Sequence, residues 1–432
     1  MTGISSSILQ KFPTEGMTLR ILQVNHYVGP GKYCPRFRPT YLAREWVKLG
    51  HDVTIVGASF SHLFIRPPEF RGDRQIEWEA GVRYVLLKTP KYSGNGTGRM
   101  LNVVAFTLQL LRMEKWFARE LAPDVVIAGS AHTMDSMPAR RLARRCKAVF
   151  AREVRDLWPL TLTEIGGYPE WHPVVKMFRA SEDYSYRTAD KVITTLPNSL
   201  EYMQARGLEA GKWEFIPHGA EIRGEDPLDV PRIHQEILAD LRARNLFILG
   251  YAGSHGPANC LDVLLDAAML LRDTPAAFVL VGNGPQKGTL ADRARALGLT
   301  NVYFLPAIQK ECIPQFLCKV SAAFISWRKK PLYRYGISPN KLMDYMLAGK
   351  PIIHAVQAHN DLVREAECGI SVAPEDPGAI ASAIRAMMLM SPVSLDAMGR
   401  RGLEYIRAHN DYANLAVKYL NALGVANHES EH

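Results

Sequence analysis

Three glycine-rich loops follow apolar segments of the chain, and each could hold a phosphate or a sugar. They are Gly29-Pro30-Gly31-Lys32, Gly253-Ser254-His255-Gly256 and Gly282-Asn283-Gly284-Pro285. Glycine lets backbone N–H groups approach a phosphate, and lysine adds positive charge. Taken alone, the first loop is as typical of a plain turn as of a phosphate site. The other two follow successive predicted strands, which indicates a phosphate or sugar site. Neither the G-x-x-x-x-G-K-[ST] loop nor the G-x-G-x-x-G fingerprint occurs.

The most specific segment for chemistry is YRYGISPNKLMDYMLAGKPIIHA. A Ser-Pro-Asn turn that ends at Asn340 opens a predicted helix, whose first turns carry Lys341 and Asp344. Asn340 and Asp344 are four residues apart and therefore share one face of that helix. Two interpretations are open. Either these side chains bind a ligand, or Asn340 caps the helix and Asp344 complements its dipole.

Polar residues also follow predicted strands in the first half of the chain. His132 comes after the strand PDVVIAG, and Asp156 comes after the next strand, beside Arg155. Ligands of doubly wound domains bind at the carboxyl ends of strands, so both side chains are candidates for catalysis. His132 could equally be a structural histidine, and Asp156 could form a surface salt bridge with Arg155.

These residues are positioned by two successive alternations of strand and helix. In the first half we expect strands at LRILQVNHY, HDVTIVGAS, GVRYVLLK, PDVVIAG, CKAVFAREV and ADKVITTLP, with a helix at PTYLAREWVKLG and a long one over 99–120. A charged stretch over 223–244 is typical of a linker. FILGYAGSHG, AAFVLVGNGP, NVYFLPAI, AAFISW and PIIHAV then supply a second set of strands. Parallel strands that are buried on both faces have this continuously apolar character, so the fold class is α/β.

Composition limits the possible classes of protein. The 432 residues are 47% hydrophobic and 22% charged, which is a globular balance, and the length suggests two or three domains. The net charge of +9 predicts an anionic partner. Six scattered cysteines, without a C-x-x-C pair, fit buried thiols in a reducing compartment. Residues 1–16 lack the apolar core of a secretory signal, so we expect either a disordered leader or a start at Met17, and a cytoplasmic protein.

Together these segments resemble glycosyltransferase family 4, whose members are retaining nucleotide-sugar transferases. The resemblance runs from Met17 to about Leu423, and it is strongest in ADKVITTLPNSLEYM, IPHGAE, the GNGP loop and LMDYMLAGKPII. SPNKLMDYMLAGKP and VRDLWP are similar to the branch that builds bacterial surface polysaccharides, which includes N-acetylfucosamine transferases. The resemblance implies the GT-B fold, in which two Rossmann-like domains face each other across a cleft. We expect these over 17–222 and 223–402, with a final helix at about 403–423 that packs back on the first domain.

The family pattern also implies donor-binding roles. Asp344 occupies the place of the acid that bonds the donor ribose, and His132 that of the histidine that contacts the donor sugar. The remaining positions would present backbone groups or line the nucleotide and diphosphate sites: Gly29, Gly31, Gly253, Ser254, Gly282, Asn283, Gly284, Ile308, Gly336, Ile337, Ser338 and Asn340.

Two departures from the family pattern concern the charges at the diphosphate. Gly336 stands where the first of two glutamates is usual, with Asp344 at the second position. Ala258 and Asn259 stand near the place of a customary lysine. The neutralising charge is therefore expected from Lys341, from Lys32 or from the Arg328-Lys329-Lys330 run.

The expected reaction moves a sugar, such as an N-acetylated deoxyhexose, from a UDP-linked donor to a lipid-diphosphate-linked or saccharide acceptor. It needs no cofactor or metal, because helix N-termini and basic side chains can stabilise the leaving diphosphate. His132 or Asp156 would act as base, or the proton would pass to the leaving phosphate. Arg36, Arg38 and Arg155 are the candidates for binding the acceptor.

Further partners and rival functions follow from the charge pattern. The predicted helix over 99–120 and the Arg140–Arg145 run mix apolar and basic residues, which suits docking on the anionic inner face of the plasma membrane. A helix that faces the core explains the same residues. The rival functions are a GT-B nucleotide-sugar epimerase or hydrolase and a basic nucleic-acid-binding protein. Because no nucleic-acid-binding motif is recognised, we expect no nucleic-acid partner.

Overall fold

The computed structural model describes residues 18–94, 96–222 and 227–425 and divides the chain into two compact units. Unit 1 runs to Pro217 and resumes at Tyr412, whereas unit 2 is His218–Asp411. The boundary precedes the predicted one because residues just after Pro217 pair with the end of unit 2. The Ala220 amide donates to the Asn410 carbonyl (2.7 Å), and the Asn410 side chain donates to the His218 carbonyl (2.6 Å). The predicted leader 1–16 lies outside the described residues.

Unit 1 is built on a sheet in the order β3-β4-β2-β1-β5-β6-β7-β8, in which only the β3–β4 pair is antiparallel. The central strands are apolar along their length because both faces of the sheet are covered. The strands are β1 (Arg20–Val24), β2 (Asp52–Ala58), β3 (Arg74–Glu79), β4 (Val82–Leu87), β5 (Val125–Ala128), β6 (Val149–Val154), β7 (Lys191–Thr194) and β8 (Trp213–Phe215).

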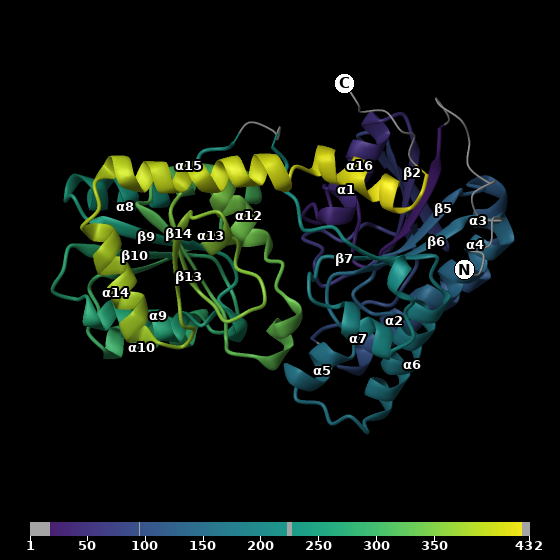
Figure 1. The fold of residues 1–432 in the computed structure, drawn as a ribbon, viewed down its shortest axis with the longest axis horizontal. Coiled ribbons are helices and arrows are strands. Elements are labelled where there is room, and N and C mark those ends of the chain that lie inside the picture. Colours follow the sequence, from purple (N-terminus) through teal and green to yellow (C-terminus); the bar gives the residue numbers. More distant parts are fainter. Residues whose placement is uncertain (1–17, 95, 223–226, 426–432) are drawn as a thin grey trace, which may run out of the picture. The chain divides into compact units, whose positions relative to one another are not determined.

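Helices connect these strands and cover the sheet (Figure 1). They are α1 (Arg38–Lys48), α2 (Thr97–Arg112), α3 (Glu114–Glu120), α4 (Ser136–Cys146), α5 (Leu160–Glu164), α6 (Pro173–Thr188) and α7 (Leu200–Ala205). The single helix predicted over 99–120 is wrong. The chain makes a turn at Met113, whose amide still bonds the Gln109 carbonyl, and α3 begins at Glu114. Met113 is buried, so the bend brings an apolar side chain into the core.

Unit 2 is built on a fully parallel sheet in the order β11-β10-β9-β12-β13-β14. Its strands are β9 (Phe247–Ala252), β10 (Ala276–Val281), β11 (Val302–Leu305), β12 (Ala322–Ser326), β13 (Ile352–Ala355) and β14 (Gly369–Val372). Its helices are α8 (Arg232–Ala243), α9 (Leu261–Leu270), α10 (Lys287–Ala296), α11 (Ile313–Cys318), α12 (Asn340–Leu347), α13 (Leu362–Glu365), α14 (Pro377–Met388) and α15 (Pro392–His409).

Two Rossmann-like halves are thus present, and the predicted α/β class is confirmed. The linker predicted over 223–244 is wrong in its second part. There α8 buries His234, Leu238 and Leu241 against the sheet of unit 2, so its charged residues are the solvent face of an amphipathic helix.

The chain returns to unit 1 through α16 (Tyr412–Ala422), which lies beside α1 (Figure 1). The Trp46 indole donates to the Ala416 carbonyl (3.0 Å), and the rings of Tyr41 and Tyr412 stack with centroids 4.9 Å apart. The helix predicted over 403–423 is therefore two helices. They separate at Asn410, which is buried and bonded to the His218 carbonyl. Only the second helix joins unit 1.

Cysteine burial largely follows expectation. All six cysteines are free thiols, and Cys34, Cys260, Cys312 and Cys368 are buried. Cys318 is exposed, contrary to the predicted burial, because it ends α11 on the surface. Among the described helices none is both long and apolar enough by itself to cross a bilayer, although α14 and α15 meet that composition as a pair bent by 115°.

A close helix crossing in unit 2 gives a test of the packing. A Cβ placed on Gly399 of α15 would lie 1.8 Å from the Gly349 carbonyl oxygen, just after α12, so Gly399→Ala must push the helices apart. We expect a loss of roughly 1–3 kcal/mol in the free energy of unfolding. Urea denaturation of the full chain measures it.

Gly288→Ala in α10 is the matched control, because a Cβ there meets no atom within 4 Å. Alanine should stabilise that helix by up to about 1 kcal/mol. Equal destabilisation by the two variants would contradict the close crossing.

Candidate active site

The second and third glycine loops pack against each other in unit 2, after β9 and β10. The Gly253 amide donates to the Val281 carbonyl, and the His255 amide donates to the Asn283 carbonyl, both at 2.9 Å. A Cβ on Gly282, whose φ is +151°, would lie 1.8 Å from the Gly253 carbonyl oxygen. Only glycine permits this approach, so the two loops form one backbone surface at the carboxyl ends of the strands.

Two lysines flank this surface without a carboxylate partner among the described residues. Lys341 donates from Nζ to the Tyr251 hydroxyl (2.9 Å) and to Asn259 Oδ1. Lys287 donates from Nζ to the carbonyls of Gly282 and Leu305, each at 2.7 Å. Burial lowers the pKa of Lys341 to about 8 and also lowers the pKa of Lys287. The site therefore holds positive charge that no neighbouring acid neutralises, as an anion site requires.

His255 lies between these charges and was not among the predicted site residues. Its side chain is buried, and neither ring nitrogen has a hydrogen-bond partner in the described part of the chain. Burial, together with Lys287 and Lys341, lowers its pKa to about 4, so the imidazole is neutral at pH 7. Lys287 was not among the predicted site residues either. Its place after the GNGP loop, in the first turn of α10, was the sequence signal that could have identified it.

The turn before α12 is fixed by side chains from elsewhere in unit 2. The Ile337 amide donates to Asn360 Oδ1 (2.8 Å), and Asn360 Nδ2 donates to the Ile337 carbonyl (2.9 Å). The Gly336 amide donates to the Tyr333 carbonyl (3.0 Å). The prediction that the amides of Gly336, Ile337 and Ser338 are all offered to a sugar is therefore wrong for the first two.

The helix α12 carries the predicted ribose-binding acid. It begins at Asn340 with Pro339 at the N-cap and no side-chain cap, so the interpretation of Asn340 as a cap is wrong. The Ala252 amide donates to the Tyr345 hydroxyl (2.9 Å), which ties α12 to the end of β9. Asp344 is partly buried, and this desolvation raises the pKa of its carboxyl. Ile308 follows β11 and packs partly into the core.

Arg328, one of the predicted sources of positive charge at the diphosphate, is already paired with acids of unit 2. Arg328 donates from Nη2 to both carboxylate oxygens of Asp262 (2.7 Å each) and also pairs with Glu375 (3.2 Å). These acids hold the pKa of Arg328 above its ordinary value. Its charge is locally neutralised, so Arg328 is a poor candidate for the diphosphate, and Lys341 is the better one.

We expect the affinity for UDP to fall about fourfold between pH 7 and pH 8.5. With a pKa near 8, Lys341 is about nine-tenths charged at the lower pH and about one-quarter charged at the higher, whereas the phosphates stay ionised. Calorimetric titration with UDP measures this, and Lys341→Met should bind more weakly with a flat profile.

Lys329→Met, at an exposed position in the same unit, should retain the wild-type pH dependence. A flat profile in the wild-type protein would contradict a role for the Lys341 charge.

The first glycine loop, in unit 1, is bound by acids of β3. The Gly31 amide donates to Glu79 Oε2 (2.7 Å), and Lys32 pairs with Glu77 (2.5 Å). The Gly29 carbonyl accepts from the Cys34 thiol (3.3 Å). Two carboxylates beside the loop oppose the binding of a phosphate. In this arrangement the acids disfavour the predicted place of Gly31 beside the diphosphate and the predicted role of Lys32 in neutralising it, and they favour the interpretation of the loop as a plain turn.

The predicted acceptor-binding arginines have different environments. Arg38 is fully buried and donates to Glu153 (2.6 Å) and to the carbonyls of Ile216 (3.2 Å) and Pro217. It is a structural ion pair, which corrects the prediction that it binds acceptor. Arg36 is partly exposed, 3.9 Å from Glu79. Arg155 donates to the Gly129 carbonyl (2.7 Å).

Arg38→Met should lower the free energy of unfolding by about 3–5 kcal/mol, because it leaves Glu153 buried without its partner. Arg36→Met should change it by less than about 1 kcal/mol, since its pair is long and near the surface. Urea denaturation checks both. Wild-type stability in Arg38→Met, together with lost acceptor binding, would restore the original assignment.

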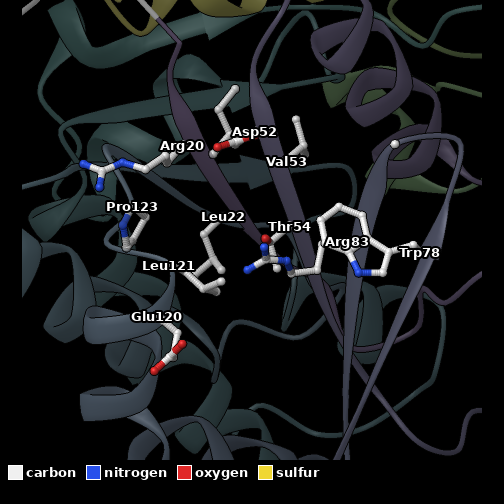
Figure 2. A pocket seen from close by; sticks show the side chains of 12 residues that line it. Arg20, Leu22, Asp52, Val53, Thr54, Trp78, Arg83, Glu120, Leu121 and Pro123 are labelled. Atoms are coloured by element: carbon white, nitrogen blue, oxygen red, sulfur yellow. The ribbon is translucent and has the colours of Figure 1, made fainter.

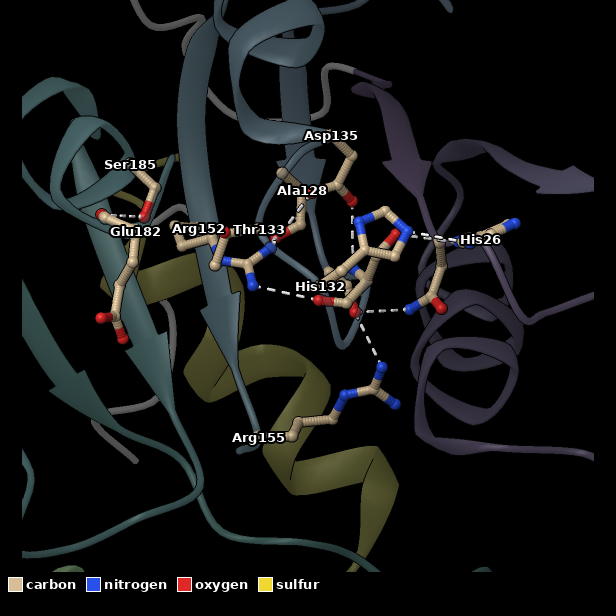
Figure 3. A network of polar contacts seen from close by, with 12 residues as sticks. His26, Ala128, His132, Thr133, Asp135, Arg152, Arg155, Glu182 and Ser185 are labelled. Carbon is tan, nitrogen blue, oxygen red and sulfur yellow. Dashed lines mark hydrogen bonds and ion pairs between the residues drawn. The ribbon is translucent and has the colours of Figure 1, made fainter. Parts of the chain in front are cut away.

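His132 belongs to a buried polar cluster at the carboxyl ends of β1 and β5 (Figure 3). Its Nε2 lies 2.8 Å from His26 Nδ1, and His26 Nε2 lies 2.5 Å from Asn102 Oδ1. Burial is the main cause that lowers the pKa of His26 to about 3 and holds the pKa of His132 well below its usual value. A buried imidazole whose pKa is lowered is a weak base, so its burial disfavours His132 in that role.

The loop that carries His132 is held by a second set of buried groups (Figure 3). Arg152 on β6 donates to Asp135 Oδ1 (3.3 Å) and to the carbonyls of Ala128 (3.1 Å) and Ser130 (3.0 Å). Asp135 Oδ2 accepts from the Ser130 amide (3.1 Å). None of these residues was predicted. The signal for Arg152 was its place as a charged residue inside an apolar strand, whereas Asp135, just before α4, carried no such signal.

Asp156 remains a candidate on position alone. It is exposed directly after β6, whereas Arg155 points its guanidinium to the Gly129 carbonyl. No ion pair between Arg155 and Asp156 is present in the described structure, so the predicted salt-bridge alternative is not supported.

A cavity of about 100 Å³ lies at the other edge of the unit 1 sheet (Figure 2). It is lined by Arg20, Asp52 and Thr54 at the amino-terminal parts of β1 and β2, with Trp78 and Glu120 nearby. Ligands of such sheets bind at the carboxyl ends, so this cavity is separate from the His132 cluster. In the described ranges no group of three metal-binding side chains comes together.

Comparison with known proteins identifies the class. The family model "Glycosyl transferase 4-like domain" matches residues 36–219, and "Glycosyl transferases group 1" matches residues 246–389. WcaI of Escherichia coli (strain K12), named for glycosyl transfer in colanic acid biosynthesis, is 23% identical over 407 residues, which are 87% of this chain and 93% of WcaI.

Solved structures agree in fold. Sucrose-phosphate synthase of Thermosynechococcus elongatus superimposes with a TM-score of 0.71 at 16% identity, covering 93% of this chain and 97% of that one. Anabaena Alr3699/HepE in complex with UDP and glucose gives a TM-score of 0.66 at 14% identity, covering 94% and 99%. Fold and strand-end clusters thus define a GT-B protein. With a glycosyl transferase 4-like model matched over residues 36–219 and a glycosyl transferases group 1 model matched over residues 246–389, the chain is a glycosyltransferase.

Proposed function

We propose that this enzyme transfers a sugar, with retention at the anomeric carbon, from a UDP-linked donor to a lipid-linked or saccharide acceptor in bacterial surface polysaccharide synthesis. The observation that carries the proposal is the pair of lysines without acid partners beside the packed glycine loops of unit 2. The name of WcaI, which refers to colanic acid, and the UDP bound to HepE support the pathway and the nucleotide.

In the proposed reaction, the bond between the anomeric carbon and the diphosphate oxygen breaks, and the diphosphate leaves with additional negative charge. Lys341 and the N-terminal amides of α10, with Lys287 beside them, would stabilise that charge electrostatically. This requires neither a metal nor a cofactor. Asp344 would bind the ribose hydroxyls, as the family resemblance implies.

The acceptor hydroxyl must lose a proton when the new glycosidic bond forms. His132 is a weak base for the reason given above, so we assign it contact with the sugar. In a retaining transfer the leaving phosphate can take the proton. Asp156 is the remaining side-chain candidate for that role.

The acceptor side is proposed to dock on anionic lipid at the inner face of the plasma membrane. On α2, Leu101 and Leu108 are 64% and 58% exposed, which suits insertion among lipid headgroups. On α4, Arg144 is exposed, whereas Arg141 and Arg145 are both paired with Glu114. The basic surface is therefore weaker than the sequence suggests, and the apolar side chains would contribute more.

A thermal-shift screen of UDP-, GDP- and dTDP-sugars, each compared with its free nucleotide, tests the donor assignment. One nucleotide family should stabilise the protein, and Asp344→Ala should reduce that shift by weakening the ribose contact. Asp344→Asn keeps the size of the side chain and isolates the loss of the carboxylate.

The nucleotide-sugar identified in this screen is then incubated with and without a saccharide acceptor. Acceptor-dependent release of UDP supports transfer. Equal turnover without acceptor would instead identify an epimerase or hydrolase, and the absence of any nucleotide response would overturn the proposal.

A further inference from the structure

The contacts around His132 determine which of its ring nitrogens carries the proton. Asn102 Nδ2 donates to the Pro90 carbonyl (2.6 Å) and faces the Phe60 carbonyl (3.4 Å). This fixes the orientation of the amide and turns Oδ1 toward His26. A carbonyl oxygen can only accept, so His26 Nε2 must be the protonated nitrogen.

The assignment continues through His26 to His132. A neutral imidazole has one protonated nitrogen, so His26 Nδ1 is an acceptor. The nitrogen that faces it at 2.8 Å is His132 Nε2, which must therefore donate. His132 Nδ1 is left with a lone pair. It is buried and has no hydrogen-bond partner among the described residues.

The surroundings keep both rings neutral. His26, Asn102 and His132 are all buried, and His26 stacks between Tyr27 and Phe106, with centroid distances of 4.5 and 4.6 Å. The charged groups that face His132 are Arg152 and Arg99, and both disfavour a second positive charge. Asp135 is engaged by Arg152 and the Ser130 amide.

We propose that Asn102 and His26 are positioning residues that fix His132 as a hydrogen-bond acceptor at Nδ1, for a hydroxyl group of the transferred sugar. The inference deepens the proposed transferase function and rests on it for the identity of the ligand. The direction of these hydrogen bonds follows from this chain's own contacts: His132 donates to His26, and His26 donates to Asn102 Oδ1. At Nδ1, His132 then selects a ligand that donates a hydrogen bond, and it gives no proton to that ligand.

Two-bond ¹⁵N–¹H correlation spectra of the full chain, labelled at histidine, test the proton order without any substrate. His26 and His132 should both appear as neutral Nε2–H tautomers from pH 5 to pH 8. A proton on Nδ1 of His132, or an imidazolium there at pH 6, would overturn the inference.

Two variants test the role of Asn102. Asn102→Leu removes the acceptor, so His26 and His132 should become mixtures of tautomers. Asn102→Asp places a carboxylate beside His26 and raises its pKa. Protonated His26 then donates from Nδ1, and the proton of His132 should move to its own Nδ1 as the pH falls. Unchanged tautomers in whichever variant folds would refute the relay.

Kinetics separate this inference from the transferase assignment. In Asn102→Leu, kcat/KM for transfer should fall about tenfold, which is the worth of one hydrogen bond, while the affinity for UDP stays unchanged. A merely structural role of Asn102 would instead leave the tautomers intact. If the wild-type protein transfers no sugar, the proposed function fails, whereas the spectra still decide the proton order.

Discussion

The buried guanidinium of Arg152 holds the loop of unit 1 that carries His132. It bonds Asp135 and the carbonyls of Ala128, at the end of β5, and of Ser130 in the following loop, and the same loop places His132 against His26. A buried pair of this kind is costly to break, because removing one partner leaves a charge in a medium of low polarity. These bonds fix the backbone of the loop, and with it the position of His132.

In unit 2, lysines with neutral partners lie beside the packed glycine loops. Its glycine loops approach so closely that no side chain fits between them, and the surface they form consists of backbone. Lys341 and Lys287 are held there by hydroxyl, amide and carbonyl oxygens. Neutral partners fix the position of a lysine without cancelling its charge, which leaves the charge available to an anion. Arg328 is the opposite case, because Asp262 and Glu375 neutralise its charge.

The sequence predicts most of the strands, the α/β class and the placement of two glycine loops after successive strands, because apolar runs and glycines act locally. It misses the edge strands β3 and β14, which are less buried than the central strands. It does not predict the partners of polar side chains, which come from distant parts of the chain. From the sequence, Lys32 is predicted to bind a phosphate, but β3 places Glu77 beside it. Likewise, the sequence offers Arg38 as a ligand for the acceptor, whereas the fold buries it against Glu153. His26 stood in a predicted strand, and only the contact with Asn102 reveals its role.

The position of α16 has a consequence for biosynthesis. Tyr412, Ala416 and Tyr419 complete the core of unit 1 against Tyr41 and Trp46, although almost the entire chain separates the two sets. Domains generally fold as the ribosome releases them, the N-terminal one first. Here the first half must wait with an uncovered apolar face until the last helix emerges, while all of unit 2 has already been synthesised. Premature termination upstream of α16 therefore damages the half of the protein that was translated first.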